Sequence, residues 1–309
     1  MKRVVLCIVG PTASGKTELG FLVAKQLRGE IISADSRQVY RHLDIGTAKP
    51  TRQQLREVKH HFVDELEPDE HFSAGEFGRK GREIINDLLR LKKVPIVVGG
   101  SGLYIRSLID GFFEGPSGDN DVRQRLNDRL HEEGAEVLLA ELRRVDPVSA
   151  SQMLASNARR IIRALEVFEL TGVPISNLHQ HKIKIDFVPL MIGLQWDRKT
   201  LYERINRRVD AMLENGFLQE VRRLLDLGYS ETTNSLQTVG YQEAIARLRG
   251  ETDYETMVEL IKRNTRRFAK RQLTWFRADK RIQWMPIPEE GNLPSMAQRV
   301  IERYYSSVT

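Results

Sequence analysis

Short apolar runs alternate with amphipathic segments over the first hundred residues. Segments 17–27 and 77–91 repeat their apolar residues at helical spacing. Four apolar runs end in glycine or polar residues, as buried strands do: 4–9, 30–34, 61–63 and 95–98. Strands that alternate with helices predict an α/β fold with a parallel sheet covered by helices on both faces.

The middle of the chain follows another pattern. From about residue 122 to 170 apolar positions repeat at helical spacing only, after a turn-rich stretch at 114–120. A strand run returns at 188–194, long helices follow, and the tail after Pro286 predicts a loop and a short amphipathic helix. We therefore predict one α/β domain over 1–114 and 186–309, interrupted by an all-helical insertion domain over 115–185.

Composition narrows the class of protein. A chain of 309 residues is long enough for about two domains, and with 40% hydrophobic and 29% charged residues it is typical of soluble globular proteins. Its single cysteine, Cys7, excludes a disulfide framework and gives no basis for a cysteine zinc site. No apolar run approaches the roughly 20 residues that cross a membrane. A monomeric cytoplasmic enzyme is the default expectation, and the net charge of +6 nominates an anionic partner.

Residues 10–17, GPTASGKT, match the phosphate-loop motif G-x-x-x-x-G-K-[ST]. The motif follows a predicted strand and opens a predicted helix, so its backbone N–H groups and the helix N-terminus can bind a di- or triphosphate. Lys16 is expected to bridge phosphate oxygens, and the Thr17 hydroxyl to ligate Mg²⁺. The predicted diphosphate-binding residues in the loop are Gly10, Thr12, Ala13, Ser14, Gly15, Lys16 and Thr17.

The motif alone does not identify the reaction. Nucleoside triphosphatases normally carry a metal-binding Asp at the end of a second strand. Here the strand at 95–98 ends in Gly99-Gly100-Ser101-Gly102, which weakens the interpretation as a triphosphatase or kinase. The kinase of a nucleotide or small molecule stays open, as does an RNA-binding module gated by a nucleotide.

Asp35 stands at the tip of another strand. Because the carboxyl ends of parallel strands share one edge, we expect it near the phosphate loop. Three roles compete for it: metal ligand, helix N-cap and general base. The side chains that follow, Ser36, Arg37 and Gln38, offer polar groups for the edge of a base.

Longer motifs carry a resemblance to a known family. The matching segments are GPTASGKT (10–17), SADSRQVY (33–40), HHFVDELEPDEHFSAGEF (60–77), VGGSGLYIRSL (98–108), NARRIIRALEVFELTG (157–172), DRKTLYERINRRVDAMLENGFLQEV (197–221), TVGYQEA (238–244) and RNTRRFAKRQLTWFR (263–277). Together they resemble the bacterial type of the tRNA dimethylallyltransferase family, the isopentenyl transferases that modify the adenosine 3′ of the anticodon. One departure is Ser101, where the family more often has Thr; the hydroxyl is kept.

The resemblance implies a sheet like that of the phosphate-loop NTPases and transfer of a dimethylallyl group from dimethylallyl diphosphate to adenine N6, with Mg²⁺ as cofactor. It implies Asp35 as the general base and Ser101 as the group that orients the adenine. Arg204 and Arg208 lie one turn apart on a helix that the resemblance places near the diphosphate, with Arg208 favoured; solvated surface arginines are the alternative. The loop then holds a diphosphate for carbon transfer.

Two basic stripes predict contacts to RNA. Six cations fall between Lys262 and Arg271 at spacings that place several on neighbouring faces of one helix, although a solvated helix is the alternative. The second stripe, on the insertion domain, is expected to hold the anticodon stem-loop. The predicted tRNA-binding residues are Asp35, Ser36, Arg37, Gln38, Ser101, Arg123, Arg159, Arg160, Arg163, Lys270 and Arg271. Both stripes argue against prenylation of free AMP. The aromatic residues Trp275, Phe276 and Trp284 are expected in the core.

Overall fold

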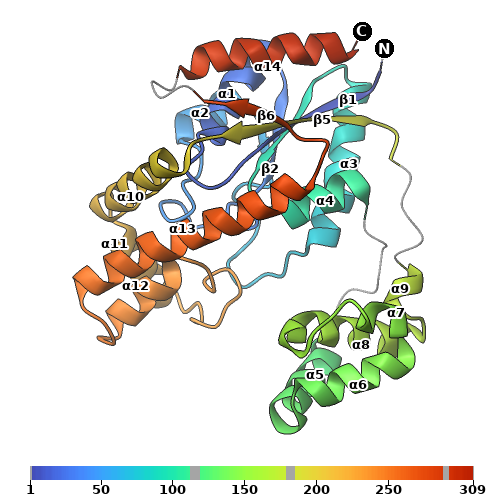
Figure 1. Ribbon diagram of the computed structural model, residues 1–309. Helices are drawn as coiled ribbons and strands as arrows, with labels where there is room; N and C mark the ends of the chain where they lie inside the picture. Colours follow the sequence, from blue (N-terminus) through green and yellow to red (C-terminus); the bar gives the residue numbers. More distant parts are fainter. Residues whose placement is uncertain (1, 112–118, 179–184, 288–291, 309) are drawn as a thin grey trace. The chain divides into compact units, whose positions relative to one another are not determined.

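The computed structural model describes residues 2–111, 119–178, 185–287 and 292–308 (Figure 1). Contacts divide the chain into two compact units, one formed by Met1–Ile109 with Asp186–Thr309 and the other by Asp110–Ile185. The predicted first boundary, at 114–115, falls within 112–118, outside the described residues. None of the described helices is both long and apolar enough to cross a membrane.

A parallel sheet forms the centre of the larger unit, in the order β3-β2-β4-β1-β5-β6. Its strands are β1 (Val4–Val9), β2 (Glu30–Ala34), β3 (His60–His61), β4 (Pro95–Gly99), β5 (Val188–Gln195) and β6 (Gln283–Pro286). The central strands β1, β2 and β4 are buried along their whole length, as expected for apolar runs between two helical layers. The predicted fold class is therefore confirmed.

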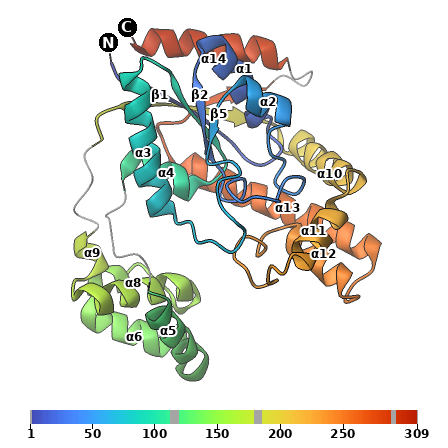
Figure 2. The ribbon, with the colours of Figure 1, turned by 180° about the vertical axis from the view of Figure 1, so that it is seen from behind.

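Helices cover both faces of the sheet. The described helices of the larger unit are α1 (Lys16–Leu27), α2 (Arg52–Glu57), α3 (Ala74–Arg90), α4 (Gly102–Asp110), α10 (Arg198–Glu214), α11 (Phe217–Asp226), α12 (Tyr241–Leu248), α13 (Tyr254–Ala278) and α14 (Leu293–Val308), of which α10–α12 pack with α13 beside the sheet. Helices α1 and α14 pack side by side over one face, where Leu19 and Val300 join Leu6 and Ile8 of β1 in one core (Figure 1). Helices α3 and α4 cover the opposite face (Figure 2).

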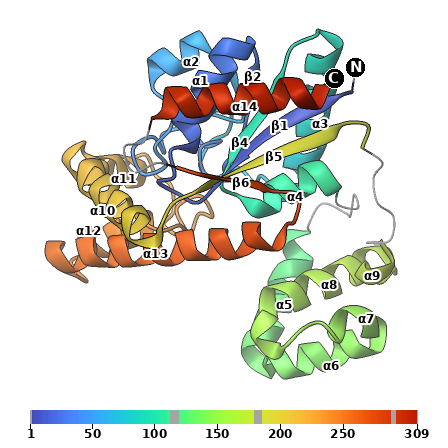
Figure 3. The same cartoon turned by 45° about the horizontal axis from the view of Figure 1, so that its top comes forward.

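Strands β3 and β6 and helix α14 are among the elements that the sequence missed or misplaced. Strand β6 was not predicted; it pairs in parallel with β5 and is only four residues long. Helix α14 has 16 residues rather than the short helix expected, and it crosses the sheet beside α1 (Figure 3). Strand β3 occupies 60–61 instead of 61–63. Brief edge strands carry too few residues for an apolar pattern to mark them.

The smaller unit is helical throughout its described residues. Its elements are α5 (Asn120–Glu133), α6 (Ala135–Val145), α7 (Pro147–Ala150), a 3₁₀ turn (Ala155–Asn157), α8 (Ala158–Thr171) and α9 (Ile175–Leu178). It has a core of its own, in which Leu126, Leu138, Leu142, Ile161 and Leu165 are buried. Because the smaller unit has its own core, its helical pattern occupies one continuous stretch of the sequence.

Candidate functional site

The register of the sheet brings three loops to one edge. Val9 of β1 and Ala34 of β2 both pair with Gly99 of β4, so the three strands end side by side. The phosphate loop, Asp35 and Ser101 follow these strand ends directly. The Ser101 N–H donates to the Ala34 carbonyl at 3.1 Å, which joins two of the loops.

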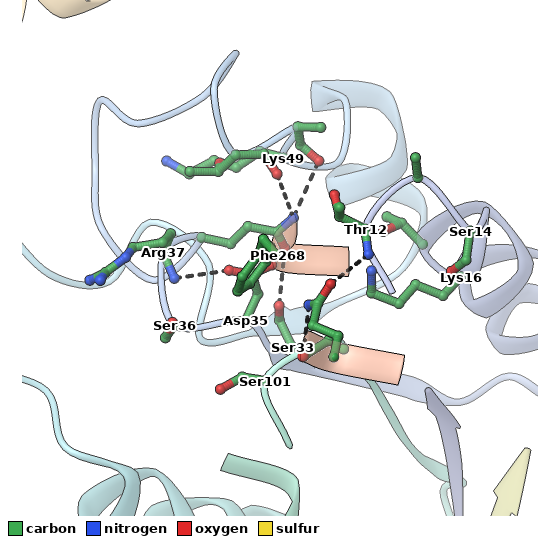
Figure 4. A pocket seen from close by; sticks show the side chains of 18 of the residues that line it. Thr12, Ser14, Lys16, Ser33, Asp35, Ser36, Arg37, Lys49, Ser101 and Phe268 are labelled. Atoms are coloured by element: carbon green, nitrogen blue, oxygen red, sulfur yellow. Dashed lines mark hydrogen bonds between the residues drawn. The ribbon is translucent and has the colours of Figure 1, made fainter. Parts of the chain in front are cut away.

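A cavity of about 580 Å³ opens at this edge (Figure 4). Most of the predicted site residues line it: Thr12, Ala13, Ser14, Gly15, Lys16, Thr17, Asp35, Ser36, Arg37, Gln38, Ser101, Arg208 and Arg271. Gly10, the first residue of the loop, is not part of the lining, and Arg204 borders an adjoining hollow with Ala13 and Gly15. Lys270 is exposed and lies outside the lining.

Lys16 is buried at the centre of the phosphate loop. Its Nζ donates to the Pro11 carbonyl at 3.1 Å. Burial lowers the pKa of Lys16 to about 8, the carboxylate of Asp35 partly offsets that effect, and the charge of Arg208 adds to it. A bound diphosphate would favour the charged form of Lys16, because its negative charge compensates for the solvation that the ammonium loses on burial.

The two predicted arginines of α10 lie against the loop. Arg208 Nη1 donates to Thr12 Oγ1 at 3.1 Å, and Arg204 Nε donates to the Ala13 carbonyl at 2.9 Å. The Arg204 guanidinium carbon also lies 4.4 Å from the centre of the Trp196 ring. Burial lowers the pKa of Arg208, and Asp35 partly offsets this. Both arginines therefore lie against the phosphate loop and are partly buried, so they are not solvated surface residues.

Asp35 does not cap a helix. Its Oδ1 accepts the Arg37 N–H at 2.9 Å, and residues 36–39 form a turn instead of a helix, so the N-cap alternative is wrong. Asx turns of this kind compete with helical caps for the same side chain. The carboxylate lines the cavity with Lys16 and Arg208, and its charge offsets part of the lowering that burial causes in the pKa of each.

Gln38 is buried and its amide is engaged within the protein. Its Oε1 accepts from Ser33 Oγ at 3.0 Å, and its Nε2 donates to the carbonyls of Thr47 and Ala48 at 3.2 Å. Residues 46–50 form one wall of the cavity, and the Gln38 side chain connects this 46–50 wall to the end of β2. This use leaves Ser36 and Arg37 as the more accessible polar groups of the turn.

Sequence reasoning missed Gln272 of α13. Its Oε1 accepts the Thr12 N–H at 2.8 Å, and its Nε2 donates to the Gly100 carbonyl at 2.9 Å. One buried amide thus joins the phosphate loop, the tip of β4 and α13. Gln272 directly follows Lys270 and Arg271 in the sequence, and a polar residue in such a charged run is expected to face solvent.

A second missed residue is Glu220 of α11, which is buried. Its carboxylate accepts the backbone N–H groups of Asp44, Ile45 and Gly46 at 2.9, 2.7 and 3.1 Å. It also accepts the Tyr241 hydroxyl at 2.7 Å. These four bonds fix the loop that leads into the 46–50 wall. Glu220 and Tyr241 lie in two segments that carry the resemblance, 197–221 and 238–244, but nothing in those segments indicated this role.

The aromatic residues of α13 divide between core and cavity. Phe276 is buried as predicted. Trp275 was expected in the core, but its side chain is 43% exposed and lines the cavity together with Phe268. Phe276 and Trp275 differ in burial because they point in different directions around the helix, and the residue type alone does not reveal that direction.

The two basic stripes differ in their partners. In the smaller unit Arg123 and Arg163 both pair with the buried carboxylate of Glu166, at 2.9 and 2.7 Å, whereas Arg159 and Arg160 are exposed. On α13, Lys262 pairs with Asp210 and Arg266 donates to Asn206 Oδ1 at 2.7 Å. The remaining predicted cations of α13 are exposed: Arg263, Arg267, Lys270 and Arg271.

Fold and site together define a phosphate-loop α/β protein whose loop faces a carboxylate and a half-buried arginine. Residues 38–279 match the family model described as IPP transferase. The tRNA dimethylallyltransferase 1 of Pelobacter propionicus is 47% identical over 93% of both chains, and the tRNA dimethylallyltransferase of Pelotomaculum thermopropionicum is 45% identical over 97% and 96%.

Two solved structures agree with these relatives. The tRNA isopentenylpyrophosphate transferase of Bacillus halodurans is 37% identical, covers both chains fully and superposes with a TM-score of 0.71. A eukaryotic dimethylallyltransferase acting on tRNA is 27% identical over 99% of this chain and 80% of its own, with a TM-score of 0.83. The chain belongs to the tRNA dimethylallyltransferase family and is a prenyl transferase.

Proposed function

We propose that this chain transfers a dimethylallyl group from dimethylallyl diphosphate to N6 of the adenosine 3′ of the anticodon in tRNA. The observation that carries the proposal is a single cavity that holds the phosphate loop, Asp35 and Arg208, with no carboxylate at the tip of β4. The names of its relatives support a tRNA substrate.

Asp35 acts as the general base. The N6 amine is a weak nucleophile because its lone pair is delocalised into the ring, and it must lose a proton as its bond to the allylic carbon forms. A carboxylate at the cavity edge accepts that proton, a contribution of about 10²–10⁴ in rate. The Arg37 N–H bond to Oδ1 orients the carboxylate, and Ser101 across the strand ends orients the adenine.

The phosphate loop and its cations stabilise the leaving group. As N6 attacks, the bond from the allylic carbon to the diphosphate oxygen breaks, and negative charge grows on the diphosphate. Lys16 and Arg208 lie where that charge develops, and the loop N–H groups add fixed dipoles. Arg204 holds the loop backbone through its bond to Ala13.

A Mg²⁺ ion fits this site through Thr17, whose side chain lines the cavity next to Lys16. Among the described residues no group of three or more His, Cys, Asp or Glu could hold a metal by itself. That donor set suits Mg²⁺, which commonly uses one or two protein ligands together with substrate phosphates and water. When bound it would neutralise part of the diphosphate charge.

The exposed cations of both units are the proposed tRNA contacts. Arg159 and Arg160 of the smaller unit and Lys270 of α13 are free to meet phosphates, and Arg123 and Arg163 are presented by Glu166. The phosphate loop, Asp35 and Arg208 all come from one unit of one chain, so we propose that a monomer suffices. Because tRNA is the proposed substrate, we propose the cytoplasm as the compartment of the reaction.

Label transfer tests the reaction class. The protein is incubated with labelled dimethylallyl diphosphate, Mg²⁺ and unmodified tRNA, and in parallel with ATP and nucleoside monophosphates. We expect the label to appear in tRNA and no phosphate to leave ATP. Phosphate transfer from ATP without prenylation would show that the loop serves a kinase.

A further inference from the structure

Two aromatic rings and a guanidinium line the cavity along one face of α13. Phe268, Arg271 and Trp275 follow one another at spacings of three and four, so they lie on adjoining turns of the helix. Phe268 is 39% and Trp275 43% exposed, although both are large apolar side chains. Large aromatic rings left open inside a cavity mark a place where a partner packs.

Trp275 lies against the start of α4, shortly after the end of β4. A Cβ atom on Gly102 would fall 2.1 Å from Cδ1 of the indole, so only a glycine leaves room for the ring at this place. Gly102 directly follows Ser101, which lines the same cavity. The indole therefore stands beside the backbone that carries the orienting hydroxyl, on the same edge as Asp35.

Contacts on the buried side of α13 fix the orientation of the helix about its own axis, and with it the direction of these three side chains. Gln272, between Arg271 and Trp275 on the buried side, is bonded to the Thr12 N–H and to the Gly100 carbonyl. Ala269 and Phe276 are buried beneath the same face. The Arg271 guanidinium carbon lies 5.7 Å from the centre of the Phe268 ring, so the cation already covers one aromatic face.

We propose that Phe268, Arg271 and Trp275 form a stacking shelf that holds the target adenine by its face. The proposal deepens the proposed function and rests on it. Aromatic rings and guanidinium planes both stack on bases, which carry a π-face. A base held by its face keeps its edge free, so N6 can turn toward Asp35 and Ser101. An allyl chain alone would not use the guanidinium.

Fluorescence of a base analogue tests the stacking shelf directly. An anticodon stem-loop RNA carries 2-aminopurine at the target position, where stacking quenches its emission, and it is saturated with wild-type protein, with Phe268→Leu or with Trp275→Leu. Tyr254→Leu is the matched control, since Tyr254 is a 44% exposed aromatic residue of α13 outside the cavity lining. Trp275→Phe keeps an aromatic face and is the conservative rescue.

We expect quenched emission with wild type, Tyr254→Leu and Trp275→Phe, and a several-fold brighter base with the two leucine variants. RNA affinity of the leucine variants should fall by at least about fivefold, because a base–aromatic stack is lost. Affinity for dimethylallyl diphosphate should stay unchanged, which also shows that the variants fold.

Two outcomes overturn the stacking shelf. One is unchanged emission in the leucine variants. The other is a loss of diphosphate affinity with RNA binding intact, which would assign the rings to the prenyl chain. Wild-type prenylation of the unlabelled RNA is measured first. Its absence would remove the proposed function, whereas both outcomes above leave that function standing.

Discussion

Two of the walls of the cavity are built in different ways. The strand-edge wall consists of the phosphate loop, Asp35 and Ser101, which follow β1, β2 and β4, and the sheet register sets their positions. The helical wall is one face of α13, from which side chains such as Phe268 and Gln272 reach inward. The first wall offers backbone dipoles and a carboxylate, and the second offers rings, an amide and cations.

This difference assigns different tasks to the two walls. Groups placed by a sheet keep their geometry when one side chain changes, which suits the reacting atoms. A long helix with cations outside and rings inside suits the grip on a nucleic acid. Changes in the strand-edge wall should therefore lower kcat, and changes in the helical wall should weaken substrate binding.

The largest effect is expected for Asp35→Asn. Loss of the proton acceptor should lower kcat by about 10²–10⁴, since a general base typically contributes that much. The tRNA dissociation constant should change little, because the amide keeps the size and the Arg37 N–H bond. The control is Asp69→Asn, an exposed residue outside the cavity lining. Equal turnover in both variants would remove Asp35 as the base.

Gln272→Leu breaks the connection between the walls. It leaves the Thr12 N–H and the Gly100 carbonyl without their partner, and each unpaired buried group costs about 1–3 kcal/mol. We expect weaker diphosphate binding and a lower kcat together, by about tenfold or more. Titration of dimethylallyl diphosphate and steady-state kinetics measure both. Gln298→Leu, on the exposed face of α14, is the control and should match wild type.

Diphosphate affinity should depend on pH through Lys16. Its pKa is lowered from 10.5 to about 8, so the ammonium is charged below that pH and neutral above it. Because the charged form binds diphosphate, the dissociation constant should be flat below about pH 8 and rise up to tenfold per pH unit above it. Binding measured across this range checks the slope. A flat profile to pH 10 would show that Lys16 stays charged in the free protein.

The smallest effect is expected for charge removal on the outer face of α13. Arg267→Gln with Lys270→Gln, both exposed and outside the cavity lining, should reduce the slope of log affinity for tRNA against log salt by about 1.5, if each cation meets one phosphate. Arg79→Gln with Arg90→Gln, on exposed positions of α3, is the matched control. An unchanged salt slope would return α13 to a solvated helix and leave the stripe of the smaller unit as the tRNA contact.

The sheet and its strand-end residues were predictable because their signals are local. Long apolar runs marked β1, β2 and β4, and parallel topology then placed Asp35 beside Lys16 without any contact being known. The edge strand β6 gave no such signal, since it has four residues and ends in a proline.

The helical wall was less predictable for a different reason. The side of α13 that faces the cavity depends on packing between elements far apart in the chain, such as Gln272 against Thr12. A glutamine in a basic run suggests solvent, and a tryptophan suggests core, yet Gln272 is buried and Trp275 is open to the cavity. Glu220 was invisible for the same reason, because its partners 44–46 are distant in sequence.

The central claim is that this phosphate loop holds a diphosphate during carbon transfer. The direct measurement counts both products of one reaction: diphosphate released, and modified nucleoside in a digest of tRNA incubated with dimethylallyl diphosphate and Mg²⁺. We expect one diphosphate for each N6-dimethylallyladenosine, located 3′ of the anticodon. Release of orthophosphate, or an unmodified adenosine at that position after diphosphate release, would contradict the account.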